Sequence, residues 1–210
     1  MTENNILPLR PFYLLRHGET FANVARIVAG GRVDTPLTEN GQAQAQALAD
    51  VIHHLPVRPS RVYHSFLSRA RDTAAIVNAP LGLDMVEHPD IHEHEFGDWE
   101  GISWDQLDIN VAQGLQPTSG ETYDAFAQRV RRGFLPILSV EHETPPLIVA
   151  HGGVFRGIGQ LYGVKTGGVE NCCLRLFSPA PENGSFPWKM TQFKPSECGQ
   201  KLVSSEIFPK

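Results

Sequence analysis

Short apolar runs and helical stripes of apolar residues follow one another along most of the chain. Residues 12–16 (FYLLR) and 147–150 (LIVA) are apolar without alternation, which is typical of strands that are buried on both faces. Residues 38–55 instead predict an amphipathic helix with Thr38 as its N-cap. In that segment the apolar side chains recur at i, i+3, i+4 and i+7, at Leu48, Val51, Ile52 and Leu55.

The rest of the chain continues this alternation of strand and helix. Further strands are predicted over residues 61–65, 83–88, 171–177 and 188–193. Further helices are predicted over residues 67–79, 118–134 and 154–162, with a turn and a short helix over 97–107. The alternation favours an α/β fold, a three-layer αβα sandwich with a mostly parallel central sheet.

The helix predicted over residues 118–134 has two features of its own. Thr118 and Glu121 have the spacing of a capping box, which predicts the start of the helix. An apolar stripe follows, and it is interpreted as part of the core because aromatic stripes at helical spacing usually pack inside. The stripe consists of Tyr123, Phe126, Val130 and Phe134.

The chain as a whole is expected to form one domain over residues 1–210, since no internal repeat or linker interrupts the pattern. From about residue 195 the sequence becomes polar. This tail is expected to be flexible, or to cover the functional site or a neighbouring subunit. The oligomeric state stays open, a homodimer included.

Composition and charge narrow the classes of partner. The chain is 41% hydrophobic and 20% charged, with a formal net charge of -5, which argues against general binding to nucleic acid or anionic membranes. The three cysteines form no CxxC pair, so a reducing compartment, the cytoplasm, is expected. The first twelve residues lack a long apolar segment, and no run approaches the roughly 20 apolar residues of a membrane span.

The first candidate for chemistry is the sequence RHG that ends the first predicted strand. Arg16 offers a planar fork of donors that matches phosphate oxygens, and His17 offers a nucleophilic or proton-transferring nitrogen. Gly18 is expected to permit a sharp turn and the close approach of a ligand. His151 follows the buried strand at 147–150. Because the carboxyl ends of parallel strands meet at one edge of a sheet, both histidines are expected there.

An arginine of the helix over residues 67–79 is a second candidate. The sequence SFLSRARDTA places Arg69 and Arg71 near the start of that helix. A helix N-terminus favours anions, and an arginine in the first turn strengthens such a site. Spacing alone does not choose between the two arginines.

The sequence IHEHEFGDWEG admits two interpretations. His92 and His94 would lie on one face of a strand and could bind a metal, although no third ligand follows at a recognisable spacing. Alternatively, Glu93 or Glu95 would serve as the general acid that cleavage of a phosphoester requires.

Five motifs in order, over residues 12–177, resemble those of the histidine phosphatase superfamily, the phosphoglycerate-mutase-like group. The sequence RHGET, with Asn23 six residues after His17, is similar to the signature R-H-G-E-[ST]-x-x-N. The sequences DTPLTENGQAQA, SFLSRARDTA, HEHEFGDWEG and VAHGG are similar to the motifs that follow it. The resemblance selects Arg69 over Arg71 and Glu93 over Glu95, and it makes His151 the second motif histidine.

The resemblance implies a hydrolase that cleaves small phosphomonoesters through a phosphohistidine intermediate. His17 would be the nucleophile, Glu93 the proton donor, and inorganic phosphate the released product. No metal or organic cofactor is implied for phosphatase members. The residues implied to hold the phosphoryl group are Arg16, Asn23, Arg69, His151 and Gly152.

Three alternatives are weighed against this interpretation. A mutase would return the phosphoryl group to a bound product, and FGDWEG and the short segment of about 28 residues between Glu93 and Glu121 disfavour it. A metal-dependent hydrolase would use His92 and His94. A non-catalytic phosphate-binding protein would keep the same fold without turnover.

The chain departs from the family pattern at two places near the expected site. Arg32 stands where the family often has an aromatic residue, and Phe66 stands where it often has proline. Substrate preference is therefore not carried over. Residues 25–33 and 101–120 are expected to set it.

Overall fold

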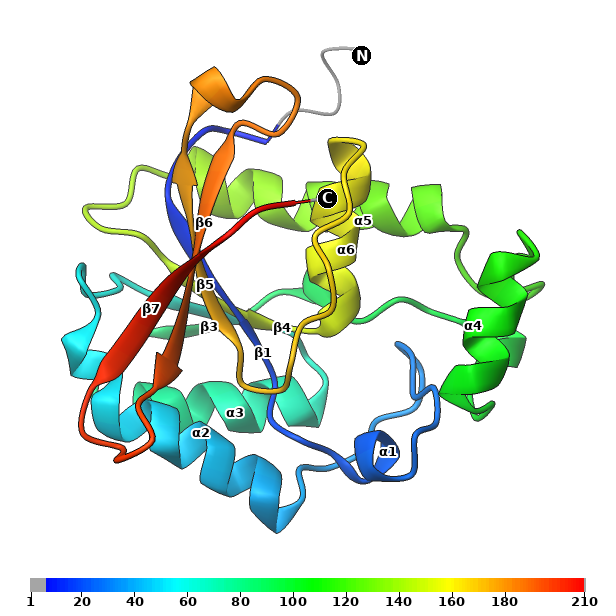
Figure 1. Cartoon of the computed structure of the whole chain (residues 1–210), viewed down its shortest axis with the longest axis horizontal. Helices are drawn as coiled ribbons and strands as arrows, with labels where there is room; N and C mark the ends of the chain where they lie inside the picture. Colours follow the sequence, from blue (N-terminus) through cyan, green and yellow to red (C-terminus); the bar gives the residue numbers. More distant parts are fainter. Residues whose placement is uncertain (1–6, 210) are drawn as a thin grey trace.

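A computed structural model describes residues 7–209 of the chain. Within them, seven strands form one sheet in the order β3-β2-β4-β1-β5-β6-β7 (Figure 1). The strands are β1 (Phe12–Arg16), β2 (Val62–His64), β3 (Met85–Glu87), β4 (Leu147–Ala150), β5 (Leu174–Pro179), β6 (Trp188–Pro195) and β7 (Leu202–Ile207). The strands β1, β2, β3 and β4 pair in parallel, whereas β5, β6 and β7 extend the sheet in antiparallel fashion. The α/β class is confirmed, and the parallel half of the sheet carries both motif histidines.

Helices cover both faces of this sheet, which gives the expected three layers. The helices α2 (Glu39–Val51) and α3 (Ser68–Asn78) lie against one face, and α5 (Tyr123–Ser139) and α6 (Gly152–Leu161) lie against the other (Figure 1). The short α1 (Phe21–Val24) and α4 (Trp104–Ala112) lie to one side of the sheet in that view. Within residues 7–209, every helix is too short or too polar to cross a membrane.

Strand β1 is buried on both faces, as its apolar run predicted. Phe12 and Leu14 belong to the core beneath α5 and α6, while Tyr13 and Leu15 belong to the core beneath α2 and α3. Because successive side chains of a strand point to opposite faces, one short strand joins the two cores. Each fully buried apolar side chain of this kind stabilises the fold by roughly 1.5–3 kcal/mol.

The predicted capping box at the start of α5 is wrong. The helix begins at Tyr123, and its N-cap is Thr122, whose side chain accepts a hydrogen bond from the Ala125 amide. Thr118 instead binds Asp98, since its amide and its hydroxyl donate to the two carboxylate oxygens over 2.8 and 2.9 Å. A carboxylate twenty residues away thus satisfies the side chain that the local spacing assigned to the helix.

Residues 202–207 of the C-terminal tail belong to the sheet. These residues form β7, which pairs antiparallel with β6 from Pro195↔Leu202 to Met190↔Ile207. Most side chains of β7 are exposed, but Leu202 and Ile207 at its two ends pack against the hydrophobic cores. The tail therefore extends the sheet.

Candidate active site

His17 and His151 meet at the carboxyl edge of the parallel strands. Strands β1 and β4 are in register at Arg16↔Ala150, and the amide of His17 donates to the carbonyl of Ala150 over 3.0 Å. His151 is the N-cap residue of α6, directly after β4. The two imidazole rings lie 5.1 Å apart at an angle of 60°, so the expectation of a shared edge is confirmed.

The imidazole of His17 is held in one tautomer. Its Nδ1 lies 2.7 Å from the carbonyl oxygen of Gly18, and a carbonyl only accepts, so Nδ1 carries the proton and Nε2 keeps its lone pair. Burial lowers the pKa of His17 well below its ordinary value, and the positive charges of Arg69 and Arg16 lower it further. Nε2 is therefore unprotonated at neutral pH, as a nucleophile must be.

A cavity of about 320 Å³ opens beside His17. Most of the predicted site residues line it, namely Arg16, His17, Asn23, Arg69, Glu93 and Gly152. His151 is not part of its wall. It is fully buried, and its ring packs against the ring of His17.

Several polar atoms at this edge have no partner among the residues that the structure describes. The Arg16 Nε and both ring nitrogens of His151 are buried and form no hydrogen bond with any residue from 7 to 209. Buried polar atoms in native proteins are nearly always paired, so these atoms are available to form hydrogen bonds with a ligand in the adjoining cavity. Burial lowers the pKa of His151 well below its ordinary value, and Arg69 and His17 add to this effect.

The two predicted arginines hold the loops around the cavity as well as facing it. Arg16 donates from Nη1 to the carbonyl of Val169 over 2.5 Å. Arg69 is almost fully buried and donates to the carbonyls of Gly30 and Val33 over 2.7 and 3.0 Å. Arg71, which spacing alone left as a competitor, does not line the cavity and pairs with its neighbour Asp72.

Of the two candidate acids, Glu93 is the one that lines the cavity. Its two oxygens accept hydrogen bonds from the amides of His94 and Gly153, over 2.9 and 3.1 Å. Burial lowers the pKa of Arg16 and of Arg69, and Glu93 is the largest influence that raises both, so its charge lies near both guanidinium groups. A Cβ atom at Gly153 would come within 1.9 Å of the carboxylate, and only glycine leaves room for it.

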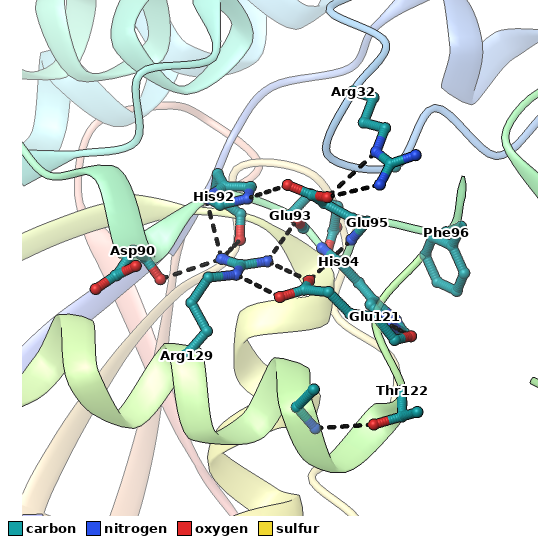
Figure 2. Close-up of polar contacts among 12 residues, drawn as sticks. Arg32, Asp90, His92, Glu93, His94, Glu95, Phe96, Glu121, Thr122 and Arg129 are labelled. Carbon is teal, nitrogen blue, oxygen red and sulfur yellow. Dashed lines mark hydrogen bonds and ion pairs between the residues drawn. The ribbon is translucent and has the colours of Figure 1, made fainter. Parts of the chain in front are cut away.

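Glu95, the other candidate for the general acid, is occupied elsewhere. Figure 2 shows its carboxylate between Arg32 and His92, with contacts of 3.1 and 3.2 Å. Arg32, which departs from the family pattern, thus fixes the neighbouring acid. The choice of Glu93 over Glu95 agrees with this geometry.

The predicted pair His92 and His94 is not arranged for metal binding. The segment lies between two 3₁₀ turns and not on a strand. His92 Nδ1 lies 2.6 Å from the carbonyl of Pro89, and His94 Nε2 lies 2.8 Å from the carbonyl of Glu121. Among residues 7–209, no three histidine, cysteine, aspartate or glutamate side chains come together as a metal site.

Arg129 holds the Glu93 loop from beneath, and sequence reasoning missed it. From helix α5 it donates to the carbonyls of Asp90, His92 and Glu93 over 3.2, 3.0 and 3.0 Å, and it pairs with Glu121 at 2.6 Å (Figure 2). Burial by itself raises the pKa of Glu121, but hydrogen bonds led by that of Arg129 outweigh it and lower the pKa. The signal in the sequence that could have indicated it was an arginine placed between the core residues Phe126 and Val130.

We expect Arg129→Met to lower the free energy of unfolding by about 3–5 kcal/mol, because it leaves Glu121 half-buried without its partner. It should also lower kcat more than it raises KM, since the loop that presents Glu93 loses three backbone contacts. Denaturant unfolding and steady-state kinetics measure the two effects. The matched control is Arg132→Met, an exposed arginine of the same helix, which should change stability by less than about 0.5 kcal/mol. Equal stability of the two variants would contradict this role.

The RHGET segment owes its other residues to packing. Gly18 does not adopt a left-handed conformation; a Cβ atom there would lie 2.4 Å from the carbonyl oxygen of Gly41 in α2. Gly18 is therefore required for the close approach of two backbones. The carboxylate of Glu19 accepts from the Thr38 hydroxyl over 2.8 Å, and Thr20 is the N-cap of α1.

Asn23 completes that N-terminal turn. Its side-chain oxygen accepts from the amide of Thr20 over 3.1 Å and from Asn171 Nδ2 over 3.0 Å. The oxygen is thus already engaged, so a contact with a phosphoryl oxygen would have to come from the NH₂ group. Asn171 also donates to the carbonyl of His17 over 3.1 Å, a link between distant segments that no local motif announces.

The two segments that were expected to set specificity lie side by side at the cavity. The amide of Val28 donates to the carbonyl of Ile102, and the amide of Trp104 donates to the carbonyl of Arg26, each over 2.9 Å. Residues 26–30 and three residues of α4 consequently share one wall of the cavity. The three are Trp104, Leu107 and Asp108.

The chain is similar to proteins of one family. A family model described as the histidine phosphatase superfamily (branch 1) matches residues 12–178. An adenosylcobalamin/alpha-ribazole phosphatase of Salmonella typhimurium is 38% identical over 154 residues, which are 68% of this chain and 74% of that protein. A probable phosphoglycerate mutase of Erwinia tasmaniensis is 33% identical over 150 residues, which are 67% of this chain and 68% of that protein.

Solved structures show the same relationship. A mycobacterial glucosyl-3-phosphoglycerate phosphatase, in a complex with VO3, matches with a TM-score of 0.73 at 28% identity, over 86% of this chain and 97% of that one. The alpha-ribazole phosphatase from Shigella flexneri matches with a TM-score of 0.66 at 30% identity, over 84% of this chain and 93% of that one.

Proposed function

The chain belongs to the histidine phosphatase superfamily and is an enzyme that hydrolyses phosphoric monoesters; on this premise, we propose that His17 is its nucleophile. One observation carries the proposal. In a single cavity, the imidazole of His17, with a fixed tautomer and a free Nε2, lies with Arg16, Arg69 and Glu93. Phosphoryl transfer needs an attacking atom, donors for the equatorial oxygens and a proton for the leaving oxygen, and this set supplies all three.

The first half of the proposed reaction transfers the phosphoryl group to the enzyme. The lone pair of His17 Nε2 forms a bond to phosphorus while the bond from phosphorus to the alcohol oxygen breaks. Arg16, Arg69 and His151 donate to the equatorial oxygens, where charge builds up in the transition state. The protonated carboxyl of Glu93 gives its proton to the leaving alkoxide and becomes a carboxylate.

The second half returns the enzyme to its starting state. A water molecule attacks the phosphorus of phosphohistidine, and Glu93 takes one proton from that water. The bond between phosphorus and nitrogen breaks, and its electron pair returns to Nε2 of His17. The products are inorganic phosphate and a neutral imidazole.

We propose that the substrate is a small phosphorylated metabolite. The relatives named as phosphatases act, by their names, on alpha-ribazole and glucosyl-3-phosphoglycerate compounds, and the cavity beside His17 is of metabolite size. All three cysteines are free thiols, which supports placing the enzyme in a reducing compartment such as the cytoplasm. The second candidate activity is that of a mutase, because one similar protein is named a probable phosphoglycerate mutase.

A panel of phosphorylated metabolites tests the proposal. Release of inorganic phosphate from at least one small phosphomonoester, absent with His17→Ala, is the expected result. The same samples are assayed for isomerisation of phosphoglycerate, with and without a bisphosphoglycerate primer. Isomerisation that exceeds phosphate release would replace the phosphatase by the mutase.

A further inference from the structure

A second cavity, of about 470 Å³, adjoins the one beside His17. The two cavities share part of their lining, so they lie on either side of the same residues. The shared residues are Phe96, Leu107, Asp108, Arg156, Gly167 and Gly168. The proposed reaction uses only the first cavity for the phosphoryl group, which leaves the second without a role.

Aromatic side chains form one wall of the second cavity. Around the ring of His94 lie the rings of Phe96, Phe126 and Tyr123, at centroid distances of 4.2, 4.6 and 5.1 Å. Burial lowers the pKa of His94, so its ring is neutral and belongs to this apolar surface. Such a wall suits a flat or apolar body more than a second phosphoryl group.

Two polar groups in this cavity have no partner in the protein. The hydroxyl of Tyr123 is buried and forms no hydrogen bond with any residue from 7 to 209. Arg156 is an exposed residue that lines both cavities, and over the same residues its guanidinium forms no hydrogen bond or ion pair. Burial raises the pKa of Tyr123 while Arg156 lowers it, which places the cation near a phenol that stays protonated. Both groups can donate hydrogen bonds, so together they suit a ligand that carries acceptor oxygens.

The sign of the charge in the cavity favours an anion. Arg156 and Lys165 line it, and Asp108, on the shared wall, is the acidic residue among its lining. The first cavity adds Arg16, Arg26 and Arg69 against Glu93 and the same Asp108. This basic site lies in a chain whose formal net charge is -5, so the positive charge is local and would concentrate anionic ligands there.

We infer that the second cavity binds the leaving alcohol of the substrate, and that this alcohol carries an aromatic or apolar body with a carboxylate or similar anionic group. The body packs on the ring wall around His94. The anionic group accepts hydrogen bonds from Arg156 and the hydroxyl of Tyr123. The inference rests on the proposed function, because it places the reacting phosphoryl group beside His17.

Three phosphomonoesters separate the parts of this inference. Glycerol 2-phosphate reaches only the first cavity, 2-naphthyl phosphate adds the ring body, and 6-carboxy-2-naphthyl phosphate adds the anion. We expect Arg156→Met to lower kcat/KM for the carboxylated ester by about tenfold or more, the size of a lost charged hydrogen bond. For the other two esters the change should stay within about twofold. Tyr123→Phe should act on the same ester in the same direction.

The three esters differ in the reactivity of their leaving groups. The kcat/KM of each variant is therefore compared with that of the wild type on the same ester. Arg61→Met is the matched control, because that exposed arginine pairs with Asp84 and lines neither cavity; it should leave all three esters unchanged. Equal losses on the three esters would overturn the inference, since Arg156 would then act on the phosphoryl group. No loss on the carboxylated ester would also overturn it.

A binding measurement keeps the inference separate from the proposed function. Calorimetry with His17→Ala gives the Kd of the carboxylated ester without turnover, and the added Arg156→Met change should raise that Kd about tenfold. If the wild type turns over none of the esters, the proposed function fails on these substrates, and the binding result still decides the role of the second cavity. An unchanged Kd would overturn it.

Discussion

Replacing His17 with alanine is expected to lower kcat/KM for every phosphomonoester substrate by at least about 10⁴-fold, because removal of a nucleophile leaves only binding and electrostatic stabilisation to accelerate the reaction. Nδ1 of His17 carries its proton and binds the Gly18 carbonyl, so Nε2 keeps a lone pair. Among the described residues, that lone pair has no partner. Water would have to attack the ester directly in the variant.

The phosphoenzyme gives this prediction its sharpest readout. Wild-type protein quenched during turnover should carry phosphate in a form that is labile to acid and stable to base, the signature of phosphohistidine, and the variant should carry none. His54→Ala is the matched control. That exposed histidine ends the short 3₁₀ helix Ile52–His54, which follows α2, and it lines neither of the two cavities. Wild-type turnover in His17→Ala would show that another group attacks phosphorus.

The parts of the fold that follow from local pattern could be predicted from the sequence. The buried runs at β1 and β4 and the helices behind them depend on side-chain periodicity within one segment, and the rule for parallel strands then places His17 and His151 at one edge. The family resemblance added Glu93 and Arg69. Local pattern and resemblance together therefore predicted which elements carry the candidate site.

The parts that depend on contacts between distant segments could not be predicted in the same way. Thr118 had the spacing of a cap, but Asp98 competes for its side chain. The strand β7 (LVSSEI) has no regular alternation of apolar and polar residues, so only its pairing with β6 reveals it. Arg129 donates to a backbone carbonyl of a loop more than thirty residues away along the chain. Side-chain hydrogen bonds between such distant residues produce no periodic pattern in the sequence.

Replacing Glu93 with glutamine is expected to lower kcat by about 10²–10⁴-fold, the range that a positioned general acid supplies. Glutamine has nearly the same shape and its amide oxygen can still accept one of the two amide hydrogen bonds from His94 and Gly153, but it has no acidic proton to give to a leaving alkoxide. The phosphate-binding donors are unchanged, so the affinity for inorganic phosphate or vanadate should stay within about threefold. A large loss of kcat with intact anion binding separates proton donation from binding.

The dependence on the leaving group tests the role of Glu93 more strictly than the size of the loss. An alkyl phosphate releases a strongly basic alkoxide that needs the proton, whereas 4-nitrophenyl phosphate releases a weakly basic phenolate that does not. Glu93→Gln should therefore lose much more activity on the alkyl ester than on the nitrophenyl ester. Glu95→Gln is the matched control, because that carboxylate is held by Arg32 and His92, and it should show no such difference. Equal losses of Glu93→Gln on the two esters would mean that the proton comes from another group, since a carboxyl that protonates the leaving oxygen cannot be equally important for both.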